Sequence, residues 1–128
     1  MNALIIDDSK AMRRILSKIV AKLGFDIVEA EDGQQGLDRL LETPDVEIVL
    51  VDWNMPVMNG LEFVQTVRAK EEYATQKIIM VTTETEPSQM VKALMAGVDE
   101  FCMKPFTAEI LTEKMKLIGV SMPAAAAG

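Results

Sequence analysis

Short apolar segments alternate with longer amphipathic segments along the chain. The apolar segments cover residues 3–6, 27–30, 48–51, 78–81 and 101–103. The first, third and fourth are continuously apolar and contain β-branched residues, which is typical of central parallel strands covered on both faces. The polar residues Asp26 and Glu29 accompany the second segment, which favours a place for it at the edge of the sheet.

Between these segments, apolar residues recur at the spacing of one helix face, which predicts five helices. The stripes are Met12, Ile15, Leu16, Ile19 and Leu23; Leu37, Leu40 and Leu41; Leu61, Val64 and Val67; Met90, Val91 and Leu94; and Leu111, Met115 and Ile118. Gly24 and Gly97 follow the first and fourth stripes, where a glycine commonly ends a helix. Pro87 stands where the fourth helix begins, and Thr107 is placed to cap the fifth.

Strict alternation of strands and helices predicts a parallel sheet with right-handed crossovers and helices on both faces. A chain of 128 residues fits one doubly wound α/β domain of the (βα)₅ type. We expect this domain to span residues 1–120. Four alanines follow Pro123, so residues 121–128 are expected to form a disordered, low-complexity tail.

Composition narrows the chemistry available to this domain. The net charge of −7 argues against a nucleic-acid partner, because phosphate backbones are bound by clustered Lys and Arg. Histidine is absent and Cys102 is the single cysteine, so chemistry must come from carboxylates, hydroxyls, lysines and bound ions. No apolar run approaches the ~20 residues that span a bilayer, and the first residues lack a secretory signal pattern. We therefore expect a cytoplasmic protein without membrane contacts.

Polar residues stand just past the carboxyl ends of four predicted strands. They are Asp7 and Asp8 after the first strand, Asp52 after the third, Thr82 at the end of the fourth, and Lys104 after the fifth. Taken singly, the Asp-Asp pair has a simpler explanation as a helix cap, and Lys104 as a solvated surface residue. Ligands bind at this edge of open α/β sheets, so the coincidence of four strand ends indicates a functional site.

The residue types at this edge suit a cation and a phosphate. Three carboxylates in one crevice repel one another, and we expect this repulsion to raise at least one carboxyl pKa. Oxygen ligands without His or Cys select a hard ion such as Mg²⁺, with Mn²⁺ as the alternative. The Lys104 ammonium and the Thr82 hydroxyl would complete a phosphate pocket. The Asp52 carboxylate could then act as a nucleophile and form an acyl phosphate.

The strings around these residues resemble response-regulator receiver domains. They are Ile6-Asp7-Asp8-Ser9, Val51-Asp52-Trp53-Asn54-Met55-Pro56, Asn59-Gly60-Leu61-Glu62, Met80-Val81-Thr82 and Lys104-Pro105-Phe106. The resemblance runs from about Ala3 to Ile118 and is strongest to the stand-alone chemotaxis receivers, which share the Asp-Trp-Asn-Met-Pro string. It implies a flavodoxin-like fold with a five-stranded parallel sheet in the order 2-1-3-4-5.

The resemblance also implies residue roles. Asp52 would be the phosphoacceptor and become 4-aspartylphosphate, with Thr82 and Lys104 contacting the phosphoryl group. The implied Mg²⁺ ligands are Asp7, Asp8, Asp52 and the backbone carbonyl of Asn54. Asn54 and Glu84 occupy the positions that tune the lifetime of the acyl phosphate.

Further expectations concern the switch beside the site. The resemblance pairs Thr82 with Phe101, which stands where the family places a switch aromatic that is often Tyr, and it implies a cis peptide bond before Pro105. Trp53 follows a strand on a loop beside the site, so we expect its ring to be partly exposed. The implied readout surface combines the fourth helix, fifth strand and fifth helix, with Met95, Lys104 and Lys114 among its residues.

These expectations amount to a two-component phosphorelay receiver that catalyses only its own phosphorylation and dephosphorylation. The implied partners are a histidine kinase as phosphodonor, a phosphatase and a flagellar-motor switch protein, with the receiver itself a monomer.

One alternative is a receiver module of a larger regulator whose effector domain is absent. A Mg²⁺-dependent phosphohydrolase would place its nucleophile in an Asp-x-Asp motif after the first strand, and a flavodoxin-like electron carrier would need a Ser/Thr/Gly-rich loop there. Asp7-Asp8 fits neither pattern.

Overall fold

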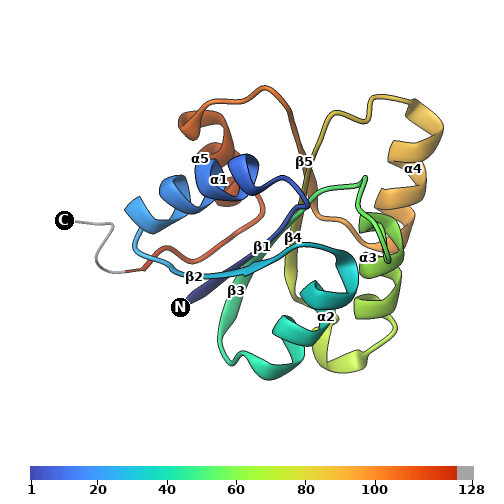
Figure 1. Ribbon diagram of the computed structural model, residues 1–128, viewed down its shortest axis with the longest axis horizontal. Helices are drawn as coiled ribbons and strands as arrows, with labels where there is room; N and C mark the ends of the chain where they lie inside the picture. The colour runs from blue at the N-terminus through green and yellow to red at the C-terminus, as the bar shows by residue number, and fades with distance from the viewer. Residues whose placement is uncertain (124–128) are drawn as a thin grey trace.

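The computed structural model describes residues 1–123 and shows the alternation of strands and helices that the apolar pattern predicts (Figure 1). The strands are β1 (Asn2–Ile6), β2 (Asp26–Ala30), β3 (Val46–Val51), β4 (Lys77–Thr82) and β5 (Glu100–Met103). The helices are α1 (Lys10–Lys22), α2 (Gly33–Glu42), α3 (Gly60–Arg68), α4 (Pro87–Ala96) and α5 (Ala108–Leu117). A short 3₁₀ helix, η1 (Glu71–Tyr73), which the periodicity did not indicate, precedes β4.

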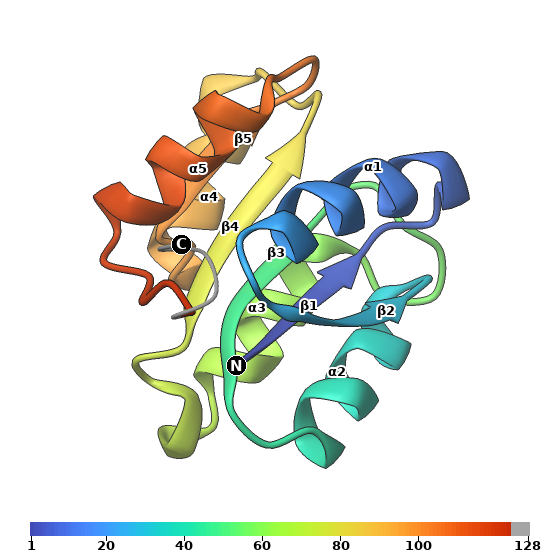
Figure 2. The ribbon, with the colours of Figure 1, turned by 90° about the vertical axis from the view of Figure 1, so that its left-hand side faces the viewer.

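The strands form one parallel sheet in the order β2-β1-β3-β4-β5. This is the order that the sequence resemblance implies, so the flavodoxin-like, doubly wound fold is confirmed. The polar-flanked strand β2 lies at one edge, as predicted, and β5 lies at the other. Helices α1 and α5 cover one face, whereas α2, α3 and α4 cover the opposite face (Figures 1 and 2).

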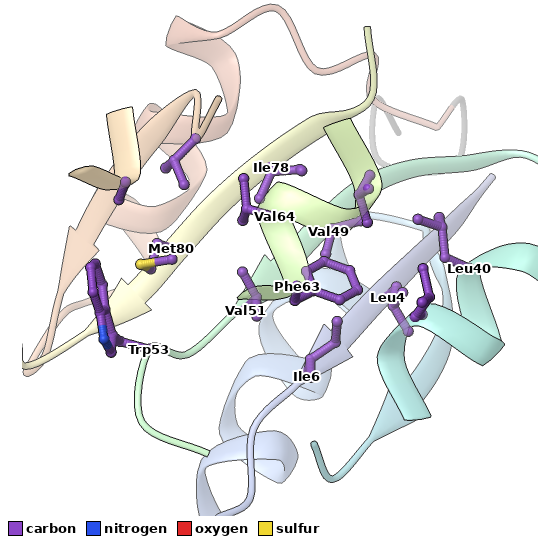
Figure 3. Packing of buried hydrophobic residues seen from close by; sticks show 14 of the residues in the cluster. Leu4, Ile6, Leu40, Val49, Val51, Trp53, Phe63, Val64, Ile78 and Met80 are labelled. Atoms are coloured by element: carbon purple, nitrogen blue, oxygen red, sulfur yellow. The ribbon is translucent and has the colours of Figure 1, made fainter. Parts of the chain in front are cut away.

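Alternate residues of the central strands supply two separate cores. In β1, Leu4 and Ile6 belong to the core beneath α2, α3 and α4, whereas Ala3 and Ile5 belong to the core beneath α1 and α5. Figure 3 shows Phe63 of α3, which is fully buried, together with Leu4 and Ile6 in the first core. Burial of one such aromatic side chain is worth roughly 1.5–3 kcal/mol. Coverage of both faces explains why the central strands are continuously apolar.

Helix ends follow from local chemistry, largely as predicted. The Thr107 hydroxyl accepts a hydrogen bond from the Ile110 amide at 3.1 Å and caps α5. Pro87 is the first residue of α4, and Gly97 ends that helix with a φ of 115°. A side chain is rarely tolerated at such a positive φ, so the glycine has a physical reason to be there.

The chain beyond α5 is described as far as Pro123. The Ser121 amide donates to a Glu47 carboxylate oxygen at 2.8 Å, and Met122 packs against the core of α1 and α5. The rest of the tail predicted for residues 121–128 lies outside the described residues, so the domain boundary at residue 120 stays a prediction. Over residues 1–123, no helix is long and apolar enough to cross a membrane.

Candidate functional site

Side chains from the carboxyl ends of β1, β3 and β5 meet at one edge of the sheet. Asp7, Asp8 and Asp52 each place one carboxylate oxygen within 4.8 Å of the others. The Lys104 Nζ lies 3.0 Å from the Asp7 Oδ2 and 3.4 Å from the Asp52 Oδ2. Asp7 is 1% exposed and Asp52 is 9% exposed, whereas Asp8 lies on the surface. The lysine therefore bridges two buried carboxylates beside a third that faces solvent.

Asp7 is held by hydrogen bonds on both its side chain and its backbone. Its Oδ1 accepts from the Ser9 amide at 2.8 Å, and its own amide donates to the Ala30 carbonyl at 3.1 Å. Its carbonyl accepts from the guanidinium of Arg13 at 2.7 Å. Because these partners lie on three different parts of the chain, namely the turn after β1, strand β2 and helix α1, Asp7 has little freedom to move.

Arg13 is a residue of this site that the sequence predictions did not include. It lies three residues before Leu16 and seven before Val20, both of which are buried, so it falls on the buried face of α1. The sequence could have indicated Arg13, because it is a charged residue on the apolar face of a predicted helix. Its partners, however, lie outside this helix, and helical periodicity does not identify them.

Asp52 is positioned by the loop that follows β3 and by the start of α3. Its Oδ1 accepts from the amide of Trp53 at 2.7 Å, and its own amide donates to the Ile6 carbonyl at 3.0 Å. Gly60 packs so closely that a Cβ there would lie 2.2 Å from the Asp52 carbonyl oxygen. Only glycine allows α3 to begin at this position without displacing Asp52.

Burial raises the pKa of Asp52 above its ordinary value. The nearby Lys104 ammonium opposes this rise, and the negative charge of Asp7 adds to it. The pKa of Asp52 is therefore raised, as predicted. The predicted cause, repulsion between carboxylates, is not the largest one. Desolvation of the carboxylate contributes more than repulsion between carboxylates.

Thr82 and Lys104 are joined through the backbone of neighbouring strands. The Lys104 amide donates to the Thr82 carbonyl at 3.0 Å, and the Thr82 hydroxyl oxygen accepts from the Glu84 amide at 3.1 Å. Thr82 is fully buried, and the Lys104–Pro105 peptide bond is cis, as predicted. Because the Thr82 oxygen accepts this bond, its hydroxyl hydrogen can still be donated to an acceptor at the end of β4.

The expectation that Trp53 is partly exposed is wrong. The residue is 7% exposed, and Figure 3 shows it among the side chains of the core beneath α2, α3 and α4, to which Met80 also belongs. Trp53 continues the alternation of Val49 and Val51, so it faces the same side of the sheet although β3 has ended. Phe101, the expected switch aromatic, is likewise buried in this core.

The remaining predicted residues lie around the rim of the site. Asn54 is exposed at the start of the loop between β3 and α3, and Glu84 is partly buried in the loop after β4. On the predicted readout surface, Met95 of α4 is 84% exposed. Lys114 of α5 lies 3.7 Å from a carboxylate oxygen of Glu100 in β5, which joins two of the three predicted elements. The Asn54 carbonyl as a metal ligand stays a prediction.

Comparisons with known proteins agree with this geometry. The family profile described as "Response regulator receiver domain" matches residues 3–116. A Chemotaxis protein CheY homolog of Campylobacter jejuni is 46% identical over 117 residues, which cover 91% of this chain and 90% of that protein. The structure of chemotaxis response regulator CheY4 of Vibrio cholerae superimposes with a TM-score of 0.85 at 32% identity, covering 91% of this chain and 97% of that one.

A more distant structure shares only the fold. It is the CheX-CheY-BeF3-Mg+2 complex from Borrelia burgdorferi, with a TM-score of 0.85 at 24% identity, covering 94% of this chain and 90% of that one.

Proposed function

Because the chain belongs to the response regulator receiver family, we propose that it accepts a phosphoryl group on Asp52 from a histidine kinase. Its similarity to CheY homologues makes chemotaxis the signalling context. Receivers of this kind are signalling proteins rather than conventional enzymes. The proposed chemistry is accordingly limited to phosphorylation and dephosphorylation of the chain itself.

The observation that carries the proposal is the position of Asp52 beside a lysine and two further carboxylates. The Asp52 carboxylate would attack the phosphorus of a phosphohistidine in line with the breaking P–N bond. The phosphoryl group would pass to a carboxylate oxygen, and the imidazole would leave with the electron pair of that bond. The Lys104 ammonium, which lies 3.4 Å from Asp52, and the Thr82 hydroxyl would contact the phosphoryl oxygens.

The donor set of the site fits Mg²⁺, with Mn²⁺ as a close substitute. Three carboxylates gather oxygen atoms within 4.8 Å, and hard divalent ions prefer such oxygen ligands. The residues that would hold the ion are Asp7, Asp8, Asp52 and the backbone carbonyl of Asn54. When bound, the ion would supply positive charge for the phosphoryl group during transfer. The Lys104 ammonium would supply further positive charge for the phosphoryl group.

The proposed output is a switch in partner binding. Thr82 and Phe101 would couple the phosphoryl group to the surface of α4, β5 and α5, where Met95 and Lys114 are accessible. Because Phe101 lacks the hydroxyl of tyrosine, apolar packing alone would stabilise its buried position. The side chains of Asn54 and Glu84 would tune the lifetime of the acyl phosphate.

The proposed partners are a histidine kinase, a phosphatase and a flagellar-motor switch protein. The Borrelia burgdorferi complex named above contains CheX together with CheY, which supports a second protein as a binding partner of the receiver. We further propose that the chain acts in the cytoplasm as a monomeric receiver over residues 1–120, without direct contact with nucleic acid or membrane.

Mass spectrometry after incubation with acetyl phosphate and Mg²⁺ tests the proposal. We expect one phosphoryl group per wild-type chain, lost in base and absent when Mg²⁺ is chelated. Asp52→Asn should remain unlabelled, whereas Asp38→Asn on the exposed side of α2 should label as the wild type does. Equal labelling of Asp52→Asn and wild type would refute Asp52 as the acceptor.

A further inference from the structure

Arg13 is a buried cation of α1 that the proposed phosphoryl transfer does not use directly. It is 8% exposed, and its Nη1 donates to the Asp7 carbonyl at 2.7 Å. Its Nε donates to Glu29 Oε1 at 3.2 Å, and its Nη2 lies 3.9 Å from Glu31 Oε1. The guanidinium therefore links the end of β2 to the turn between β1 and α1.

The contact with Asp7 acts on the peptide unit that joins the two acidic residues. The Asp7 carbonyl belongs to the planar group between Asp7 and Asp8, and a planar peptide turns as one body. A donor fixed against that carbonyl therefore limits rotation of the whole unit. The Asp7 carboxylate is held separately, by the Ser9 amide at 2.8 Å and by Lys104 at 3.0 Å. Together these contacts set the directions in which two consecutive carboxylates leave the chain.

The positive charge of Arg13 is compensated by carboxylates that do not belong to the Asp7, Asp8 and Asp52 cluster. Glu29 and Glu31 provide its carboxylate partners, with side chains that are 49% and 66% exposed. The guanidinium thus directs Nε and Nη2 toward these two glutamates and Nη1 toward a backbone carbonyl. It does not draw on the carboxylates of Asp7 or Asp8 for its charge compensation.

We propose that Arg13 is a positioning residue for the Asp7–Asp8 pair and thereby sets the affinity of the site for a divalent cation. The inference rests on the proposed Mg²⁺ site. Groups that orient metal ligands without touching the metal change its affinity by about 10–100-fold when removed. Arg13 acts in this way through the backbone between two ligands rather than through a ligand side chain.

Geometry and charge predict opposite effects for the loss of Arg13. Removal of a positive charge beside a cation site strengthens cation binding through Coulomb's law. Loss of the hydrogen bond to the Asp7 carbonyl lets the peptide unit rotate and weakens binding. Arg14 is the next residue of α1 and carries the same charge, but it is exposed. The Arg14→Ala variant therefore serves as the control for removal of one positive charge from α1 without loss of the contact with Asp7.

The experiment is a calorimetric titration of Mg²⁺ into unphosphorylated protein, with circular dichroism as a check that each variant is folded. We expect Arg13→Ala to raise the Mg²⁺ dissociation constant by about 10-fold or more. Arg14→Ala should leave it unchanged or lower it slightly. Glu29→Gln keeps the donor to Asp7, so it should bind Mg²⁺ nearly as the wild type does. Arg13→Lys keeps the charge but not the planar fork, and we expect an intermediate dissociation constant.

A folded Arg13→Ala variant that binds Mg²⁺ as tightly as wild type, or more tightly, would overturn the inference. Where that variant fails to fold, Arg13→Lys decides, and a dissociation constant within about twofold of wild type overturns the inference in the same way. Failure of the proposed function looks different, because wild-type protein would then show no Mg²⁺ binding, or Asp8→Asn would leave it intact.

Discussion

Replacement of Lys104 by methionine removes the only cation placed between Asp7 and Asp52 among residues 1–123. The two ion pairs measure 3.0 Å and 3.4 Å, and the lysine side chain is 15% exposed. Loss of one partner from a buried pair costs about 3–5 kcal/mol, because the remaining charge stays desolvated. Since water reaches this lysine, we expect the lower end, about 3 kcal/mol, or roughly 10 °C in Tm for a domain of this size.

The assay is urea unfolding without metal at pH 7, with Lys92→Met on the exposed side of α4 as the matched control. We expect Lys92→Met to change the free energy of unfolding by less than about 0.5 kcal/mol. Saturating Mg²⁺ should restore much of the loss in Lys104→Met, because an ion that binds only the native state stabilises it. If Lys104→Met and Lys92→Met are equally stable without metal, the bridge between the two carboxylates does not stabilise the fold.

The pH dependence of the same variant has a definite sign. Burial raises the pKa of Asp52 in the native state, and Lys104 opposes that rise. A carboxyl whose native pKa is raised favours the fold while it is protonated, and this contribution is lost as the pH rises through the native pKa. The deficit of Lys104→Met should therefore shrink as the pH falls below neutrality toward the ordinary carboxyl range. A deficit that stays constant or grows on acidification would contradict the assigned cause.

Variants at three further positions follow from the same geometry. Asp52→Asn should unfold at higher urea than wild type at pH 7 without metal, because it removes a carboxyl whose native pKa is raised, and the difference should shrink as the pH falls through the ordinary carboxyl range; a difference that does not change with pH would contradict this. Gly60→Ala should lose about 1–3 kcal/mol by urea unfolding and label more slowly with acetyl phosphate, since its Cβ would lie 2.2 Å from the Asp52 carbonyl oxygen. Val57 has a φ of 68° and is 81% exposed, so Val57→Asn should gain about 1 kcal/mol by relieving a strained backbone, whereas Val57→Ala should gain less.

Much of the fold was predictable because its signals are local. Continuous apolar runs identified the central strands, and residues such as Pro87, Gly97 and Thr107 marked helix ends where the structure has them. The strand order came from the family resemblance rather than from periodicity. The order depends on which strands pair in space, which a period along one strand does not determine.

The sequence predicted which residues gather at the site, but not which residues hold them in position. Asp7, Asp52 and Lys104 could be placed together because the carboxyl ends of parallel strands share one edge of the sheet. The burial of Trp53 and the contact between Arg13 and the Asp7 carbonyl depend on how helices seat against the sheet. Such contacts join residues whose spacing along the chain carries no regular signal.

The bridge between Asp7 and Lys104 joins the first strand to the last, across 97 positions of sequence. Contacts of such high sequence separation close the largest loops and are costly to form early in folding. A growing chain acquires Asp7, Asp8 and Asp52 long before it acquires the lysine that completes the pocket. A chain that extends only as far as β4 contains all three carboxylates but not the lysine that lies between two of them. The three carboxylates and the lysine are therefore all present only once the chain extends past β5.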